Sequence, residues 1–117
     1  MTDTLSYQEY AAQLDTQMRK GFLVYCVLLL CSRGNVYSSD IIKKLRDADL
    51  VVVEGTIYPL LSRLQKDGLL AHNWKESTQG PPRKYYQITD NGKNVLLEMH
   101  KSYLQLKATI NNIEKDQ

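Results

Sequence analysis

The feature that most constrains the fold is a long stretch of helical spacing near the start of the chain. Residues 5–33 contain no proline and one glycine, Gly21. Their apolar side chains recur every three or four residues, as in an α-helix; the series is Tyr10, Leu14, Met18, Phe22, Tyr25 and Leu29. The first half is amphipathic, whereas the second half is apolar nearly all round and should be buried on every side. The pattern predicts the central helix of the domain, with a first half that forms a separate turn or arm.

The apolar part of this stretch carries no sign of a membrane anchor or a reactive site. Its ten residues, 22–31, are too few to cross a bilayer, since a spanning helix needs about 20 residues. The preceding segment holds Asp3, Glu9 and Asp15, unlike the basic start of a signal peptide. Cys26 and Cys31 lie five residues apart in apolar surroundings, so we expect both to pack as small apolar side chains. The chain is therefore expected to be cytoplasmic, with no membrane partner.

Two shorter helices are expected to follow. Gly34-Asn35 ends the first helix, and Ser38 or Ser39 can cap a second helix over residues 40–47. Residues 50–53, a leucine and three β-branched valines, predict a brief edge strand or an extended loop. A third helix comes next, and because proline is tolerated only in a first turn, Pro59 places its cap within a residue or two of Gly55 or Thr56. Lys66-Asp67-Gly68 ends this helix with the glycine that left-handed caps favour.

The second half of the chain predicts a hairpin and a last helix. Residues 69–75 and 83–88 resemble strands, and the polar connection 76–82 is expected to be a mobile tip. Thr89 or Asp90 then caps a helix that runs to about residue 114. Three helices, a hairpin and a further helix predict an α+β, mainly α fold: a winged helix-turn-helix domain over residues 1–92, followed by a C-terminal dimerisation helix over residues 93–117. With 117 residues, the chain has room for one core only.

The third helix has one apolar stripe and one polar face. Its stripe, spaced for a single helix face, is Ile57, Leu60, Leu61 and Leu64. The opposite face carries hydroxyls, an amide and cations, the groups that reach phosphates and base edges in a DNA major groove. Taken alone, this face is equally typical of a solvated amphipathic helix. Charge adds a second indication, because the net charge of +2 conceals a net +3 over residues 56–88, which hold five basic and two acidic residues.

The motif spanning these elements is similar to the signature of the PadR family of bacterial transcriptional regulators. The similarity is dense over residues 55–70, at Trp74 and Glu76-Ser77, over residues 80–89 and at Gly92, and looser over residues 20–50. It implies a winged helix that binds operator DNA as a dimer, usually represses, and often releases DNA when a small molecule binds. It assigns DNA contacts to the third helix and the hairpin, here Thr56, Tyr58, Ser62, Arg63, Lys66, Lys75, Arg83 and Lys84. One departure is Ser38-Ser39-Asp40-Ile41, where many members have a sequence like Gly-Tyr-Glu-Ile.

The last helix carries an unbroken heptad stripe. Its apolar residues, spaced alternately by three and four, are Leu96, Met99, Tyr103, Leu106, Ile110 and Ile113. Folding back onto the first helix would cover part of this stripe, and we expect both that packing and association with a second copy across a twofold axis. A twofold homodimer presents two recognition helices, so the operator should be an inverted repeat in double-stranded DNA.

The resemblance also implies a cavity between the first and last helices that accepts a small apolar or aromatic effector. Its lining here would be Leu14, Met18, Met99, Ser102 and Tyr103. Methionine and tyrosine at this spacing are more often plain core packing than a ligand site. His72 and His100 stand apart from any metal-ligand pattern and are expected on the surface, and Trp74 is expected to anchor the hairpin.

These observations favour a dimeric, sequence-specific DNA-binding transcriptional regulator, most simply a repressor that an effector releases. The alternative is a winged-helix module that binds another protein through the same third helix. An enzyme is not expected, because the chain offers no catalytic triad, paired carboxylates, phosphate-binding glycine loop or metal ligands. No cofactor is expected for the same reason.

Overall fold

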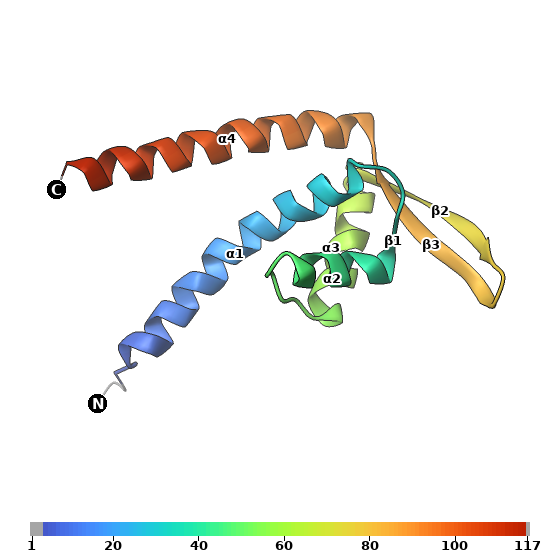
Figure 1. Ribbon diagram of the computed structural model, residues 1–117, viewed down its shortest axis with the longest axis horizontal. Coiled ribbons are helices and arrows are strands. Elements are labelled where there is room, and N and C mark those ends of the chain that lie inside the picture. Colours follow the sequence, from blue (N-terminus) through green and yellow to red (C-terminus); the bar gives the residue numbers. More distant parts are fainter. Residues whose placement is uncertain (1–3, 117) are drawn as a thin grey trace.

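The computed structural model describes residues 4–116 and confirms the mainly helical winged-helix fold (Figure 1). A small antiparallel sheet, with strand order β1-β3-β2, lies beside three packed helices. The elements are α1 Tyr7–Cys31, β1 Val36–Tyr37, α2 Ser38–Asp47, α3 Glu54–Lys66, β2 Leu70–Ser77, β3 Gly80–Ile88 and α4 Asp90–Lys115. Residues 1–3 and 117, the outer ends of the two expected units, lie outside the described residues.

The core forms between the second half of α1, the helices α2 and α3, and the inner face of the sheet. Its fully buried side chains are Val27, Leu28, Cys31, Ile41, Ile57, Leu61 and Leu70. The expectation that the second half of α1 is buried on every side is wrong, because Phe22 and Leu29 remain 44% and 36% exposed. The first half of α1 extends away from the domain as an arm (Figure 1), with Met18 62% exposed. A single copy of the chain therefore leaves much of this helix uncovered.

Two helix ends follow from local sequence chemistry. At the start of α1, Ser6 caps the helix, because its Oγ accepts a hydrogen bond from the Glu9 N–H at 3.1 Å and its hydroxyl donates to the Glu9 carboxylate at 3.0 Å. At the end of α3, Gly68 has a φ of +81°. Its N–H donates to the Gln65 carbonyl, and the Leu69 N–H donates to the Leu64 carbonyl at 2.9 Å. This is the left-handed glycine end that the sequence predicted.

The start of α2 differs from the prediction. The helix begins at Ser38, so neither Ser38 nor Ser39 is its cap; Tyr37 occupies that position without a capping side-chain hydrogen bond. Tyr37 cannot enter the helix because its backbone is extended and pairs with Tyr85 of β3. This two-residue strand, β1, was not expected, since two residues are too few to show a period.

The start of α3 also differs, and residues 51–53 form the extended loop rather than a strand. The helix begins at Glu54 and its cap is Val53, two residues before Gly55, so Pro59 lies beyond the first turn, where it was not expected. The Val53 carbonyl accepts hydrogen bonds from the N–H groups of Thr56 and Ile57, which starts the helix early. Pro59 then removes only the bond to the Gly55 carbonyl, and because Gly55 is exposed, water can satisfy that oxygen.

The hairpin is longer and tighter than predicted. Strands β2 and β3 leave only Thr78-Gln79 between them, so the mobile tip expected over residues 76–82 is wrong. The pairing register shifts between Lys75 and Ser77, where β3 holds the extra residue of a bulge at Pro81 and Pro82. Beyond Tyr85, β1 no longer pairs with β3, so prolines without an N–H donor are tolerated at this edge.

A tight joint sets the direction of α4. Thr89 caps the helix, since its Oγ accepts from the Gly92 N–H at 3.0 Å and its hydroxyl donates to the Gly68 carbonyl at 2.6 Å. Gly92 is buried against the Leu69 carbonyl, and a Cβ there would lie 2.6 Å from Ile88 Cγ1. From this joint α4 packs against the second half of α1, and the two helices then diverge toward their outer ends (Figure 1). The radius of gyration, 17.6 Å, exceeds the roughly 13 Å expected for a compact chain of this length.

Candidate nucleic-acid interface

Helix α3 presents the polar face that its sequence predicted. Ile57, Leu61 and Leu64 are buried, and Leu60 packs partly against them. Thr56, Ser62, Arg63 and Lys66 are exposed on the other sides of the helix, and Tyr58 is half-buried. The apolar stripe therefore fixes the helix in the core while its hydroxyls and cations stay available to a partner.

A polar cleft of about 410 Å³ lies between α3, the start of α2 and the hairpin. Its lining is Tyr37, Ser38, Tyr58, Ser62, Trp74, Pro82, Arg83, Lys84 and Tyr86. Four of the candidate DNA contacts therefore meet here, two from α3 and two from β3. The other four, Thr56, Arg63, Lys66 and Lys75, are exposed outside this lining.

Five lining residues were not among the candidate contacts named from the sequence: Tyr37, Ser38, Trp74, Pro82 and Tyr86. Tyr37 and Ser38 reach the cleft because β1 delivers the start of α2 beside the hairpin. Trp74 is 61% exposed, so the expectation that it anchors the hairpin by burial is wrong. Period-two alternation places it on the inner face with Leu70 and Tyr86, but the helices cover that face only as far as Tyr86. The sequence signal that could have identified Trp74 as a lining residue is an aromatic side chain at an inward-facing strand position beyond the core.

The cations of the hairpin are not neutralised by the protein. Lys75 lies directly opposite Arg83 across the two strands, and Lys84 lies opposite Trp74. Among residues 4–116, all ion pairs lie within α1 or α4, so no carboxylate pairs with these three cations. In the same cleft, burial raises the pKa of the Tyr58 hydroxyl, with Glu54, Tyr37 and Tyr86 adding to the effect. Tyr58 is therefore a protonated donor at neutral pH.

The histidines and cysteines form no second chemical centre in residues 4–116. His72 is half-buried between Trp74 and Tyr86 rather than on the surface, with ring centroids 6.2 and 6.3 Å away. Cys31 is buried, and burial raises the pKa of its thiol to about 12. Within the same residues, no group of three or more metal-ligating side chains comes together, and no helix is long and apolar enough to span a bilayer.

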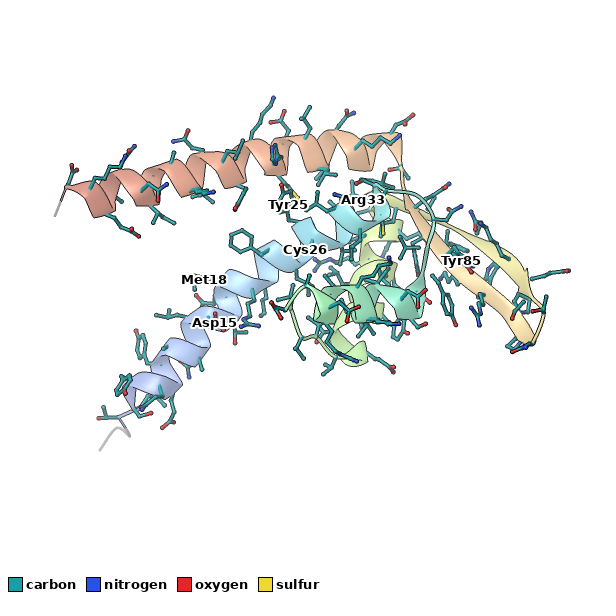
Figure 2. The ribbon with its side chains drawn as sticks, viewed as in Figure 1. Asp15, Met18, Tyr25, Cys26, Arg33 and Tyr85 are labelled. Atoms are coloured by element: carbon teal, nitrogen blue, oxygen red, sulfur yellow. The ribbon has the colours of Figure 1, made fainter. Side chains whose placement is uncertain are left out.

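A second, apolar cavity of about 300 Å³ lies where α4 packs against the second half of α1. It is lined by Met18, Gly21, Phe22, Tyr25, Met99, Ser102, Tyr103 and Leu106. Four of the five residues named as effector contacts are among them, whereas Leu14 is not. Tyr25 lies between the two helices (Figure 2), and its hydroxyl is 2.8 Å from His100 Nδ1. His100 is exposed, as expected, but it also joins the two helices.

The heptad stripe of α4 divides into two parts. Leu96 and Met99 pack against the core of their own chain, and Tyr103 lies edge-on to Phe22 at 6.2 Å between centroids. Leu106, at the outer end of the cavity, and Ile110 and Ile113 beyond it are 57%, 54% and 60% exposed. The far end of α4 thus carries an apolar stripe that its own chain leaves uncovered.

Comparison with known proteins places this arrangement among bacterial regulators. Residues 27–98 match the model of the transcriptional regulator PadR-like family. A PadR-like transcription factor from Bacteroides fragilis is 53% identical, with a TM-score of 0.74 over 86% of this chain and 98% of that one. A PadR family regulator from Eggerthella lenta is 33% identical, with a TM-score of 0.81 over 92% and 94%. A PadR-like regulator from Bacillus cereus is 42% identical, with a TM-score of 0.74 over 83% and 95%.

Proposed function

Because the chain belongs to the PadR-like family of transcriptional regulators, we propose that it binds operator DNA as a homodimer through α3 and the hairpin, the wing. The family is one of DNA-binding regulators rather than enzymes. The observation that carries the proposal is the cleft in which Tyr58 and Ser62 of α3 meet Arg83 and Lys84 of the wing. Hydroxyl donors beside cations that no carboxylate neutralises match the contacts proteins make with nucleic acid.

The two elements have different roles in this proposal. Helix α3 enters the major groove, where Arg63 and its exposed neighbours Thr56, Ser62 and Lys66 read base edges and adjoining phosphates. The wing cations Lys75, Arg83 and Lys84 contact the flanking phosphate backbone, with Tyr58 donating from the cleft. Base contacts specify the sequence, whereas phosphate contacts supply affinity and register.

Dimerisation divides the chain into the two units expected from sequence, a DNA-binding domain over residues 1–92 and a dimerisation helix over residues 93–117. This division is supported by the exposed apolar residues at the far end of α4, Leu106, Ile110 and Ile113, and by the uncovered arm of α1. A twofold dimer would place two α3 helices about 34 Å apart, or a simple multiple of that distance, on an inverted repeat.

Repression relieved by an effector is the regulatory part of the proposal. The cavity between α1 and α4 is lined mainly by apolar and aromatic side chains, which suit a small apolar or aromatic ligand. A ligand there would change the angle between the two helices, and with it the spacing of the two α3 helices. A screen of planar aromatic compounds for release of bound DNA tests this step, and Ser102→Trp, which fills the cavity, should abolish any release. A screen in which no compound releases DNA would remove the effector from the proposal.

Selection of bound duplexes from random-sequence DNA, followed by gel shifts across a salt series, tests DNA binding itself. The selection should recover an inverted repeat. Arg63→Ala and Lys84→Ala should both weaken binding to it, and Arg63→Ala should also relax sequence preference. Each lost phosphate contact should lower the slope of log affinity against log salt by about 0.9. The matched control is Lys101→Ala, which removes an exposed cation of α4 that is distant from the wing.

The alternative, a winged-helix module that binds another protein, would give a different result. Selection would then enrich no sequence, and neither Arg63→Ala nor Lys84→Ala would change the weak affinity for DNA. The cleft favours DNA over this alternative, because its lining combines cations with hydroxyl donors.

A further inference from the structure

The two faces of the wing carry an arrangement that the DNA contacts alone do not explain. On the outer face, Tyr37 of β1 lies directly opposite Tyr85 of β3, with ring centroids 5.6 Å apart. The Arg83 guanidinium lies 4.8 Å from the centroid of the Tyr37 ring, and Lys75 Nζ lies 5.0 Å from that of Tyr85. On the inner face, Lys84 Nζ lies 5.1 Å from Tyr86 and 5.9 Å from Trp74. Each cation of the wing is therefore seated over an aromatic ring.

The pairing register explains why the cations of the outer face lie over rings. Lys75 and Arg83 are directly opposite each other on the same face of the hairpin. Like charges in that position destabilise an antiparallel pair. Each of the two cations instead turns back along its face toward a ring, Arg83 over Tyr37 and Lys75 over Tyr85 (Figure 2 labels Tyr85 on the sheet). The rings thus offset a repulsion that the hairpin would otherwise carry.

A cation held over an aromatic ring, an arrangement called an aromatic seat below, differs chemically from a cation in an ion pair. A carboxylate would hold Arg83 equally well, but it would neutralise the charge and compete with phosphate. The face of a tyrosine ring attracts a cation weakly, through its quadrupole, and leaves the full positive charge available. Because long cationic side chains lose rotamer freedom when they bind, a cation that is already held in place loses less on contact with DNA.

We propose that Tyr37 and Tyr85 are positioning residues, which hold Arg83 and Lys75 ready for the phosphate backbone without contacting DNA themselves. The inference rests on the proposed function, since it assumes that the wing meets phosphates. It adds a residue from β1, outside both α3 and the wing, to the determinants of affinity. Tyr37 also occupies the cap position of α2, so the same residue connects the wing to the helical core.

A double-mutant cycle tests the Tyr37 seat on the duplex recovered by selection with the wild-type protein. Arg83→Gln should weaken binding and reduce the salt slope. Tyr37→Leu should weaken binding about tenfold in a dimer with two wings. In the Arg83→Gln background, Tyr37→Leu should cost almost nothing further, because the side chain it positions is gone. Tyr37→Phe, which keeps the ring, should restore most of the affinity.

A control variant and two contrary outcomes complete the test of the Tyr37 contact. Trp74→Leu removes a ring from the other face, so its effect should simply add to that of Arg83→Gln. If Tyr37→Leu weakens binding equally with and without Arg83, the ring acts through the fold or through its own contact with DNA from the cleft, and the inference is wrong. If Arg83→Gln changes neither affinity nor salt slope, the proposed wing contact itself fails. Tyr85→Leu with Lys75→Gln repeats the cycle for the second seat, and decides the matter if thermal melting shows that Tyr37→Leu does not fold.

Discussion

Replacing Leu106 with glutamate is expected to separate the proposed dimer into monomers. Leu106 is 57% exposed in the single chain and shares its stripe with Ile110 and Ile113. Complete burial of a leucine contributes about 1.5–3 kcal/mol, so burying the exposed part would contribute roughly 1–1.5 kcal/mol per protomer. The twofold axis doubles this to about 2–3 kcal/mol, roughly 30- to 150-fold in the dimer dissociation constant. Leu106→Ala should show that loss.

Leu106→Glu adds a larger effect, because dimerisation would also bury two ionised carboxylates without partners, at several kcal/mol each by order of magnitude. Sedimentation velocity over a concentration series measures the dissociation constant, and gel shifts on the selected duplex measure the loss of operator affinity. Asn112→Glu introduces the same charge on a side of α4 that faces away from the stripe, and should leave the dimer intact. Circular dichroism should show a folded Leu106→Glu monomer, since Leu106 lies outside the buried core.

One result would refute the reasoning. If both Leu106→Glu and Ile110→Glu sediment as dimers with the wild-type dissociation constant and bind operator normally, the dimer interface lies elsewhere on the chain. A loss of helical signal in one variant would leave the other to decide.

Three further predictions concern the folded domain. Gly92→Ala should lower the free energy of unfolding by about 2–3 kcal/mol, measured by thermal or denaturant melting, because the added Cβ would overlap the Leu69 carbonyl and force α4 from its joint. Asp49→Gly should instead raise it by about 0.5–1 kcal/mol in the same melts, since Asp49 ends α2 with a φ of 69°, which glycine adopts without strain. Cys31 should resist alkylation at neutral pH until the protein unfolds, because burial raises the pKa of its thiol to about 12 and holds it protonated; mass spectrometry of labelled peptides would detect early reaction, which would contradict its burial.

Much of the fold could be predicted from the sequence because its signals are local. The apolar stripe of α3, the glycine that ends it at Gly68 and the Thr89 cap of α4 each depend on residues within a turn or two. The same local signals led to errors where a distant contact overrode them. Pro59 lies beyond the first turn of α3 because the preceding loop starts the helix early, and Tyr37 replaces the expected serine caps because it pairs with Tyr85.

The candidate site shows the same division. Its cations and hydroxyls, from Thr56 to Lys84, could be named from the sequence, because residue type, position and the family resemblance all point to them. The seats under Arg83 and Lys75 could not, because Tyr37 reaches the wing only through a two-residue strand formed with β3. Likewise, the heptad stripe of α4 was visible in the sequence, but only the folded chain separates Leu96 and Met99, which pack on their own core, from Leu106, Ile110 and Ile113, which do not.

The sequence by itself determined the order of elements, the inward stripe of each helix and the residues with chemistry for DNA, because periodicity and caps are encoded within a few neighbouring positions. The tertiary structure alone decided which side chains meet and which remain uncovered. Contact between segments far apart in the chain depends on how the whole core closes, and that information is held by no single segment.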